Sequence, residues 1–212
     1  MPIHDKTIEK IASQMYEPKL PYHNFGHAVT VMRHSEAIIE RCKKENVPLD
    51  ETVVYYALIF HDAGYHEDHV AKGSESKEAY SAKLAEPALR DHGVDEESIQ
   101  KVKAAILATH IDAQCYSNED IAVRASDLSG LALDYPTFKL NTVRLKEEHE
   151  LMHGESVAWE DWTLGVTDNL ELFLREELKL TSDYHDASGT SVFHERTRSN
   201  IQTLLADKSP FL

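Results

Sequence analysis

The sequence lacks a long apolar run and contains few cysteines. No stretch approaches the roughly 18 consecutive apolar residues that a membrane-spanning helix needs, so we expect no membrane span. The first residues, MPIHDKTIEK, have no apolar segment behind basic residues, which argues against a secretory signal. The 2 cysteines, Cys42 and Cys115, form neither a disulfide framework nor a paired-cysteine metal motif. We therefore expect a cytoplasmic protein whose cysteines are small buried residues.

Basic residues are also scarce. The 212 residues include 22 Lys and Arg against 37 Asp and Glu, which gives a formal net charge of −15. A surface of that sign repels the phosphates of nucleic-acid polymers and of anionic membranes, so neither is an expected partner. A small phosphorylated ligand stays compatible with this charge, because a bound divalent cation can reverse its sign locally.

Strand patterns are the third absence, since no segment alternates apolar and polar residues. Apolar residues recur at helical spacing, which predicts an all-α fold: a compact single-domain bundle of about eight to ten helices over residues 1–212. Asn24 and Asp50 are predicted N-caps, and the segment 51–62 is apolar on all sides and therefore central. The polar segment 181–190 is expected to be a surface loop. The helices are predicted near 8–15, 24–46, 51–62, 74–93 and 96–110, from 117 or 118 onward, from 136 onward, and near 157–180 and 192–206.

Among the 13 histidines, the doublet His61–Asp62 stands at the end of the most apolar predicted helix. A charged Asp is unfavourable there, because its surroundings are apolar and the C-terminal end of a helix dipole is negative. A bound cation would compensate both effects. A hydrogen bond between Asp62 and a buried His61 is the structural alternative, and it is the commoner arrangement for an isolated pair.

Two further places carry the same residue types. His23 and His27 are four apart, but Asn24 stands where a zinc-protease motif would have Glu. As the N-cap, Asn24 leaves His23 outside the helix and places His27 in its first turn. Asp127 ends an apolar stretch, and taken alone it could cap a helix or pair with Arg124. Two His and two Asp together would suit Mn, Fe, Co, Ni or Zn, and also Mg.

These residues, in this order, resemble the pattern of the HD-domain superfamily of metal-dependent phosphohydrolases, and more closely its small bacterial predicted phosphohydrolases. The resemblance runs from about residue 20 to 205. It implies an HD core over about 20–135, followed by C-terminal helices over 136–206. The strings that carry it are YHN…H at 22–27, FHDA at 60–63, SA…LA at 81–85, ATH at 108–110, DL at 127–128 and Glu195…Arg198…Asn200.

The resemblance also implies roles for individual residues. The ligands of one divalent metal ion would be His27, His61, Asp62 and Asp127. The string from His23 to His27 is similar to that of cyclic-nucleotide phosphodiesterases, where the first His protonates the leaving oxygen. Tyr65 stands where that branch has another His, so a cyclic nucleotide is not the expected substrate. The catalytic residues would be His23, Asp62 and Asp127, and the residues near substrate would be His110, Lys72 and Glu78.

The expected function is therefore cleavage of a phosphate ester or nucleotide phosphate by metal-activated water, with a small phosphorylated metabolite or nucleotide as partner. A second metal ion could be held with the help of His110, or less well of His92. A regulatory module that kept the fold without the chemistry is one alternative. A di-iron oxygenase of the same superfamily is another, although it needs six ligands and the sequence offers four or five.

Overall fold

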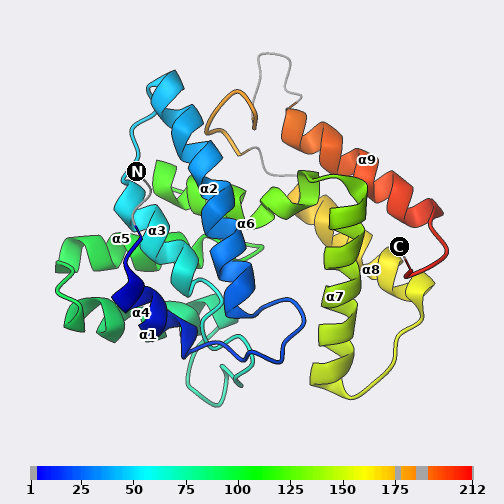
Figure 1. Ribbon diagram of the computed structural model, residues 1–212, viewed down its shortest axis with the longest axis horizontal. Coiled ribbons are helices and arrows are strands. Elements are labelled where there is room, and N and C mark those ends of the chain that lie inside the picture. The colour runs from blue at the N-terminus through cyan, green and yellow to red at the C-terminus, as the bar shows by residue number, and fades with distance from the viewer. Residues whose placement is uncertain (1–3, 175–177, 185–190, 212) are drawn as a thin grey trace. The chain divides into compact units, whose positions relative to one another are not determined.

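Every regular element in the described part of the chain is a helix, as the computed structural model shows (Figure 1). The structure describes residues 4–174, 178–184 and 191–211. The all-α prediction is confirmed for these residues, which contain nine α-helices and no strand. The elements are α1 (Lys6–Ser13), α2 (Phe25–Glu45), α3 (Glu51–Phe60), α4 (Lys77–Asp91), α5 (Glu96–Leu107), α6 (Asn118–Leu128), the 3₁₀ helix η1 (Ser129–Ala132), α7 (Tyr135–His153), α8 (Trp159–Phe173) and α9 (Val192–Ala206).

The chain divides into two compact units, residues 1–127 and 128–212. The division falls at the end of α6, somewhat before the expected end of the HD core near residue 135. That the whole chain acts as one HD-type domain stays a prediction. None of the described helices combines the length and apolar character that a membrane crossing requires.

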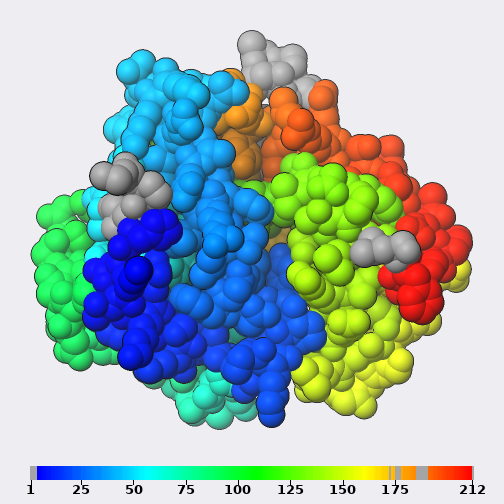
Figure 2. Space-filling view, viewed as in Figure 1, coloured from blue at the N-terminus to red at the C-terminus, as the bar shows by residue number. Residues whose placement is uncertain are grey.

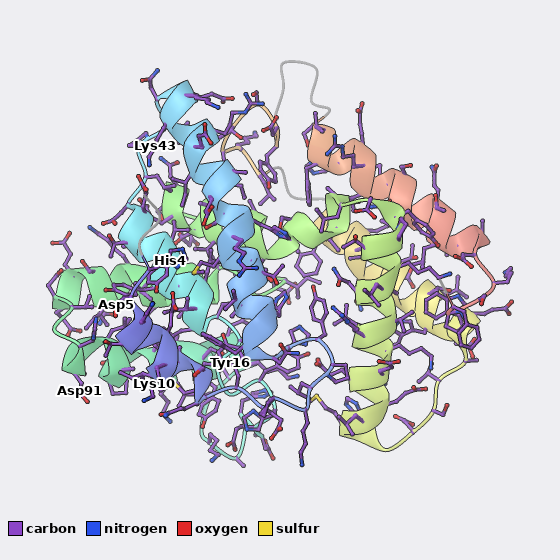
Figure 3. All side chains as sticks on the ribbon, viewed as in Figure 1. His4, Asp5, Lys10, Tyr16, Lys43 and Asp91 are labelled. Carbon is purple, nitrogen blue, oxygen red and sulfur yellow. The ribbon has the colours of Figure 1, made fainter. Side chains whose placement is uncertain are left out.

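Helix α3 forms the centre of the first unit. Its residues from Val53 to Phe60 are all buried, as the apolar pattern predicts. It contacts α1, α2, α4 and α5. Tyr16, which follows α1 and is labelled in Figure 3, donates a hydrogen bond to the Ile59 carbonyl at 3.0 Å. Helix α2 packs one side on α3 and turns the other to solvent (Figure 2).

The predicted caps are found at the helix starts. The Asn24 side chain accepts from the backbone N–H groups of Gly26 and His27, and that of Asp50 accepts from Thr52 and Val53. Each cap satisfies two of the N–H groups that a helix start leaves without partners. The start of α2 and the start of α3 are therefore fixed by local sequence.

Several helix ends differ from the prediction, three of them by three residues or more. Helix α4 begins at Lys77 rather than near 74, because the Ser76 hydroxyl caps it. Helix α5 ends at Leu107 rather than at 110, where the Thr109 hydroxyl donates to the Ile106 carbonyl and the chain tightens into turns. Helix α8 ends at Phe173, not at 180.

The chain over 178–184 is irregular, and its apolar residues are buried. Leu178, Leu180 and Tyr184 are all buried, and the Leu180 N–H donates to the Leu178 carbonyl in a tight turn. Burial of Leu178 and Leu180 agrees with the apolar pattern, but the helix predicted there is wrong. Tyr184 is buried although the segment 181–190 was expected to be a surface loop. Residues 185–190 of the expected loop lie outside the described residues.

In the second unit, α9 contacts η1, α7 and α8. Polar side chains tie the ends of these helices together. The Trp159 indole donates to the Asp207 carbonyl at 3.0 Å, and Lys139 binds the Asp207 carboxylate at 2.8 Å. Asn200 donates to the carbonyls of Leu131 and Leu133, so α9 holds the chain around η1 in place.

Candidate metal centre

Four of the predicted residues converge within the first unit. His27 comes from the first turn of α2, His61 and Asp62 directly follow α3, and Asp127 lies in the last turn of α6. His27 Nε2 lies 3.6 Å from Asp62 Oδ2 and 3.4 Å from Asp127 Oδ1. His61 Nε2 lies 3.0 Å from Asp62 Oδ2 and 3.4 Å from Asp127 Oδ1. His27, His61 and Asp127 form a group whose ligand atoms all lie within 4.8 Å of one another.

The cap of α2 aims His27. Besides capping with its oxygen, Asn24 donates from Nδ2 to the Leu20 carbonyl at 2.8 Å. Both ends of its amide are thereby fixed. The His27 side chain, 8% exposed, is held at a helix start that cannot rotate without breaking these bonds.

His61 is held in one orientation by the end of α3. Its ring is 1% exposed, and Nδ1 lies 2.7 Å from the Leu58 carbonyl, to which Nδ1–H donates. In the neutral ring this bond leaves the lone pair on Nε2, the atom that faces the carboxylates. A backbone carbonyl that fixes the tautomer in this way is a usual partner of a metal-binding histidine.

The turn after the doublet requires glycine. Gly64 has φ +73, and a Cβ there would lie 2.7 Å from the Tyr80 ring and 2.8 Å from Leu84 Cδ1. Its N–H donates to the Met15 carbonyl at 2.8 Å, and the Ser81 hydroxyl donates to the Ala63 carbonyl. The chain that follows Asp62 is thus pinned to the segment after α1 and to α4.

The contacts of Arg124 answer one of the alternatives for Asp127. The guanidinium is buried and donates to the carbonyls of His110, Ile111 and Ala113. It therefore organises the loop before α6. Asp127 instead faces the imidazoles of His27 and His61.

Three buried polar atoms of the cluster have no hydrogen-bond partner among the residues that the structure describes. They are His27 Nε2, His61 Nε2 and Asp62 Oδ2. Such atoms are rare inside proteins, since an unpaired buried polar group costs about 1–3 kcal/mol. A local hydrogen bond between Asp62 and His61 does not account for them. Two imidazole nitrogens and a carboxylate oxygen that face one another have the arrangement expected of ligands to a cation.

Proximity shifts the pKa values of these groups. Burial raises the pKa of Asp62, but the charges of His61 and His23 outweigh burial and bring it to about 2. Burial also opposes ionisation of Asp127, yet the imidazoles of His27 and His61 hold its pKa well below the ordinary value. Burial lowers the pKa of His61, and the Asp62 and Asp127 carboxylates reverse this and raise it well above its usual range. The carboxylates thus strongly favour a positive charge between them.

His23 lies beside this cluster in an aromatic stack. Its ring is 5.7 Å from that of His27 and stacks on Tyr65 at 3.8 Å with an interplanar angle of 18°. Lys77 Nζ lies 3.5 Å from the centroid of the Tyr65 ring. Sequence reasoning named neither Tyr65 nor Lys77 for the site. No local pattern signals them, because the stack joins the start of α2 to the loop after α3 and to the start of α4.

The remaining candidates have other neighbours. His110 Nδ1 accepts from the Asp112 N–H at 3.2 Å, and Lys72 pairs with Glu67 at 3.1 Å on the surface. His92 Nε2 binds Asp5 at 2.7 Å. Among the described residues, neither His110 nor His92 belongs to the group that could hold an ion. The substrate roles of His110, Lys72 and Glu78 stay predictions.

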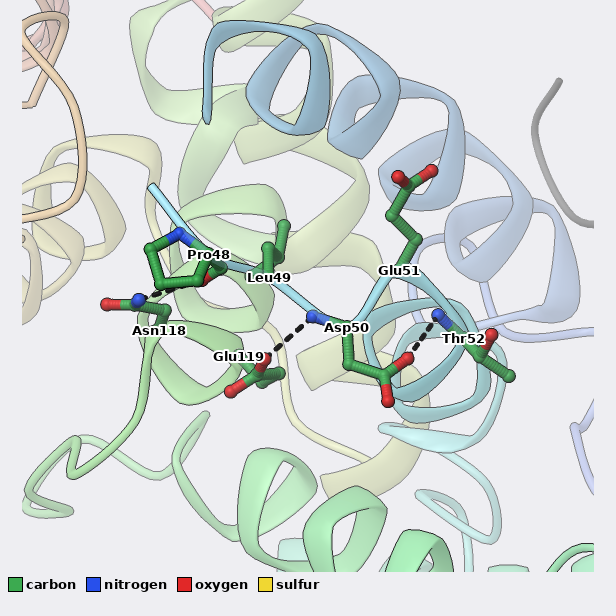
Figure 4. A pocket seen from close by; sticks show the side chains of 7 residues that line it. All are labelled: Pro48, Leu49, Asp50, Glu51, Thr52, Asn118 and Glu119. Atoms are coloured by element: carbon green, nitrogen blue, oxygen red, sulfur yellow. Dashed lines mark hydrogen bonds between the residues drawn. The ribbon is translucent and has the colours of Figure 1, made fainter. Parts of the chain in front are cut away.

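A separate pocket of about 810 Å³ lies where α3 and α6 begin (Figure 4). Three of its lining residues are acidic, but the side chains of two of them accept hydrogen bonds from backbone N–H groups. The Asp50 side chain caps α3, and Glu119 accepts from the Asp50 N–H at 2.7 Å. None of the four residues of the cluster lines this pocket.

Comparison with known protein families finds none that matches the chain, and no curated protein resembles it significantly in sequence. The candidate function therefore rests on the site itself and on the sequence motifs.

Proposed function

We propose that the chain is a metal-dependent phosphohydrolase of the HD-domain type. The observation that carries the proposal is the set of buried, unpartnered atoms on His27, His61 and Asp62, which Asp127 completes. Two imidazole nitrogens and two carboxylates form a mixed donor set that suits Mn, Fe, Co, Ni or Zn, and also Mg. The order of these residues in the chain, which resembles the HD pattern, supports the same proposal.

The residues present fit one divalent ion. His27, His61, Asp62 and Asp127 would hold it, and His110 remains the candidate for a second ion. An ion in such a site supplies positive charge that polarises a phosphoryl oxygen and makes water a better nucleophile. Both imidazoles are rigidly supported by Asn24 and by the Leu58 carbonyl, so the donor atoms are preorganised.

The other steps belong to side chains of this protein. Asp62 and Asp127 each have a second carboxylate oxygen that would accept the proton of the attacking water. His23 would protonate the departing oxygen, and general acid catalysis of this kind contributes about 10²–10⁴-fold. Tyr65 orients the His23 ring by stacking, and Lys77 supplies a cation for a phosphate group beside it.

The substrate class follows from the charge of the protein. With a net charge of −15, the surface disfavours long phosphate polymers, and an ion held by the cluster would supply the local positive potential. We propose a small phosphorylated metabolite or nucleotide. Monoester, diester and pyrophosphate bonds are distinguished by p-nitrophenyl phosphate, bis-p-nitrophenyl phosphate and a nucleoside triphosphate as probes.

The test combines metal analysis with hydrolysis. Purified protein should contain one divalent ion per chain and hydrolyse one probe with added Mn²⁺, Co²⁺, Ni²⁺ or Mg²⁺. His61→Gln and Asp127→Asn should lose both metal and hydrolysis while keeping the helical circular dichroism spectrum. His66→Gln, a substitution in the exposed loop after the doublet, should keep both.

Other outcomes contradict the proposal in different ways. Full hydrolysis in folded His61→Gln would remove this cluster from the chemistry. A chain that binds no stoichiometric metal would be a regulatory module. A coloured protein with two irons that consumes oxygen would be an oxygenase.

A further inference from the structure

The last turn of α7 carries a second pair of histidines, in the second unit of the chain. Residues 149–153 read HELMH, and α7 ends at His153. Residues four apart lie on one face of a helix, and the two rings are stacked, with centroids 4.3 Å apart and planes at 29°. Two imidazoles therefore project together from the end of a rigid helix.

Both rings are oriented by neighbours rather than by each other alone. His153 Nδ1 lies 2.9 Å from the His149 carbonyl, to which Nδ1–H donates, so Nε2 carries the lone pair in the neutral ring. The His149 ring packs on Trp162 of α8 at 5.3 Å, and the Trp162 indole is itself fixed by the Thr142 carbonyl at 3.1 Å. Preorganisation of this kind lowers the cost of gathering two ligands around an ion.

The same five residues match the pattern of zinc proteases, in which Glu is the general base. Here Glu150 has other partners: Lys146 at 2.6 Å, the Ser156 hydroxyl at 3.1 Å and the Val157 N–H at 2.8 Å. Among the described residues, no third acid, His or Cys forms a ligand group with His149 and His153. The arrangement therefore supports a two-histidine chelate and not a protease centre.

The electrostatic position of the pair favours a cation. The C-terminal end of a helix carries about half a negative charge, and α7 ends at His153 with Gly154 as its left-handed cap. His153 is exposed and His149 is half-buried, so an ion can reach them from solvent. Imidazole pairs select Ni²⁺, Cu²⁺ and Zn²⁺ over Mg²⁺ and Ca²⁺.

We propose that His149 and His153 form a second, solvent-accessible site for one transition-metal ion of the Ni²⁺, Cu²⁺ or Zn²⁺ class. Water or a ligand from outside the chain completes the coordination. All residues of this site come from α7, whereas those of the first site come from residues 1–127. The two sites can therefore be tested separately, and the second does not depend on the proposed hydrolysis.

Trp162 provides a local readout, because a paramagnetic ion held on the neighbouring His149 quenches indole fluorescence. Metal-free, full-length protein is titrated with Cu²⁺ and its tryptophan emission recorded. We expect saturable quenching that weakens on the order of 100-fold in His149→Gln or His153→Gln, since loss of one of two linked contacts removes the effective-concentration advantage. His66→Gln is the matched histidine control, and Trp162→Phe should remove most of the signal.

Electron paramagnetic resonance of the first Cu²⁺ bound by His61→Gln should show two equivalent imidazole nitrogens. Unchanged quenching affinity in His153→Gln, or a spectrum with one imidazole, would overturn the second site. Loss of hydrolysis in His61→Gln with quenching retained would support both proposals. Quenching retained with no hydrolysis in the wild-type chain would leave this site standing and remove only the proposed function.

Discussion

The turn that follows the His61–Asp62 doublet gives the sharpest link between sequence, stability and site. Gly64→Ala places a methyl group at a left-handed φ of +73, 2.7 Å from the Tyr80 ring and 2.8 Å from Leu84 Cδ1. Tyr80 is buried and its ring is rigid, so the turn has to move. Gly73→Ala is the matched control, because its φ is +74 and a Cβ there would meet no atom within 4 Å.

The two variants share the backbone cost, and only one has the overlap. A left-handed conformation costs an L-residue about 1–2 kcal/mol. Replacing Gly by Ala also lowers the conformational entropy of the unfolded chain, which offsets a few tenths of a kcal/mol of this cost. Overpacking adds about 1–3 kcal/mol at Gly64. We therefore expect Gly73→Ala to lose about 0.5–1.5 kcal/mol and Gly64→Ala about 1.5–4.5 kcal/mol of unfolding free energy.

Urea denaturation followed by circular dichroism measures both losses. Metal affinity, measured by calorimetry, should fall in Gly64→Ala alone, because movement of the turn displaces Asp62 two residues earlier. Equal losses of stability in the two variants would show that the packing against Tyr80 and Leu84 does not fix the turn. Unchanged metal affinity in a destabilised Gly64→Ala would break the link between this turn and the site.

Three further outcomes can be measured on single variants. Tyr65→Leu should lower the kcat for the probe that is hydrolysed about tenfold or more with little change in metal content, whereas Tyr65→Phe, which keeps the ring, should restore it; equal activity of the two would refute the stacking role of His23. Arg124→Met should cost about 2–5 kcal/mol in urea unfolding, because three partly buried carbonyls lose their buried donor, and a loss below 1 kcal/mol would contradict that account. Glu150 has a pKa lowered to about 2 by its bonds from Lys146 and the Val157 N–H. Its contribution to stability is therefore complete above its unfolded pKa near 4.5 and disappears as the pH falls toward 2. The stability difference between wild type and Glu150→Gln should be present at pH 6 and shrink between about pH 4.5 and 2 in urea titrations, and a difference independent of pH would exclude the carboxylate as its source.

Local signals predicted the helices best where capping residues mark them. Asn24 and Asp50 cap α2 and α3 as expected, and α9 spans the predicted 192–206. The end of α8 was missed because buried leucines at 178 and 180 suit an irregular segment as well as a helix. Apolar periodicity indicates which residues are buried. It identifies a helix only where the helical backbone hydrogen bonds continue.

Some residues of the site were also predicted from the sequence, and others were not. Each of the four candidate ligands stands near a helix terminus, but each taken alone had a structural alternative, and their combination was predicted only through the resemblance to the HD pattern. The stack of His23, Tyr65 and Lys77 was not predicted, and the resemblance implied Lys72 rather than Lys77 as the lysine near substrate. Which lysine meets the aromatic ring depends on where α4 begins, and this is set by the Ser76 cap.

The helix ends explain why the cluster suits an ion better than an internal salt bridge. Asp62 follows the C-terminal end of α3, and Asp127 lies in the last turn of α6, where helix dipoles disfavour negative charge by about 0.3–1 kcal/mol each. His27 lies in the first turn of α2, where the dipole disfavours a protonated ring. Three of the four charged partners of such salt bridges would therefore stand at an unfavourable helix end, and only a protonated His61, at the C-cap of α3, would stand at a favourable one. A dication gains from the C-terminal ends of α3 and α6 and takes a lone pair from a neutral His27.

An ion bound by the cluster would make the stability of the fold depend on metal. At a free metal concentration of 100 times Kd, binding to the folded state alone adds about 2.7 kcal/mol. For a chain of this length, that free energy raises Tm by about 5–10 °C. Removing the ion with a chelator should lower Tm by this amount in the wild type, and returning Mn²⁺ or Co²⁺ should restore it. Asp127→Asn should melt at the same temperature with and without chelator, because three remaining donors hold the ion weakly. Wild-type protein that melts at one temperature in both conditions would show that the cluster holds no ion, and the orphaned atoms would then be a cost that the rest of the fold sustains.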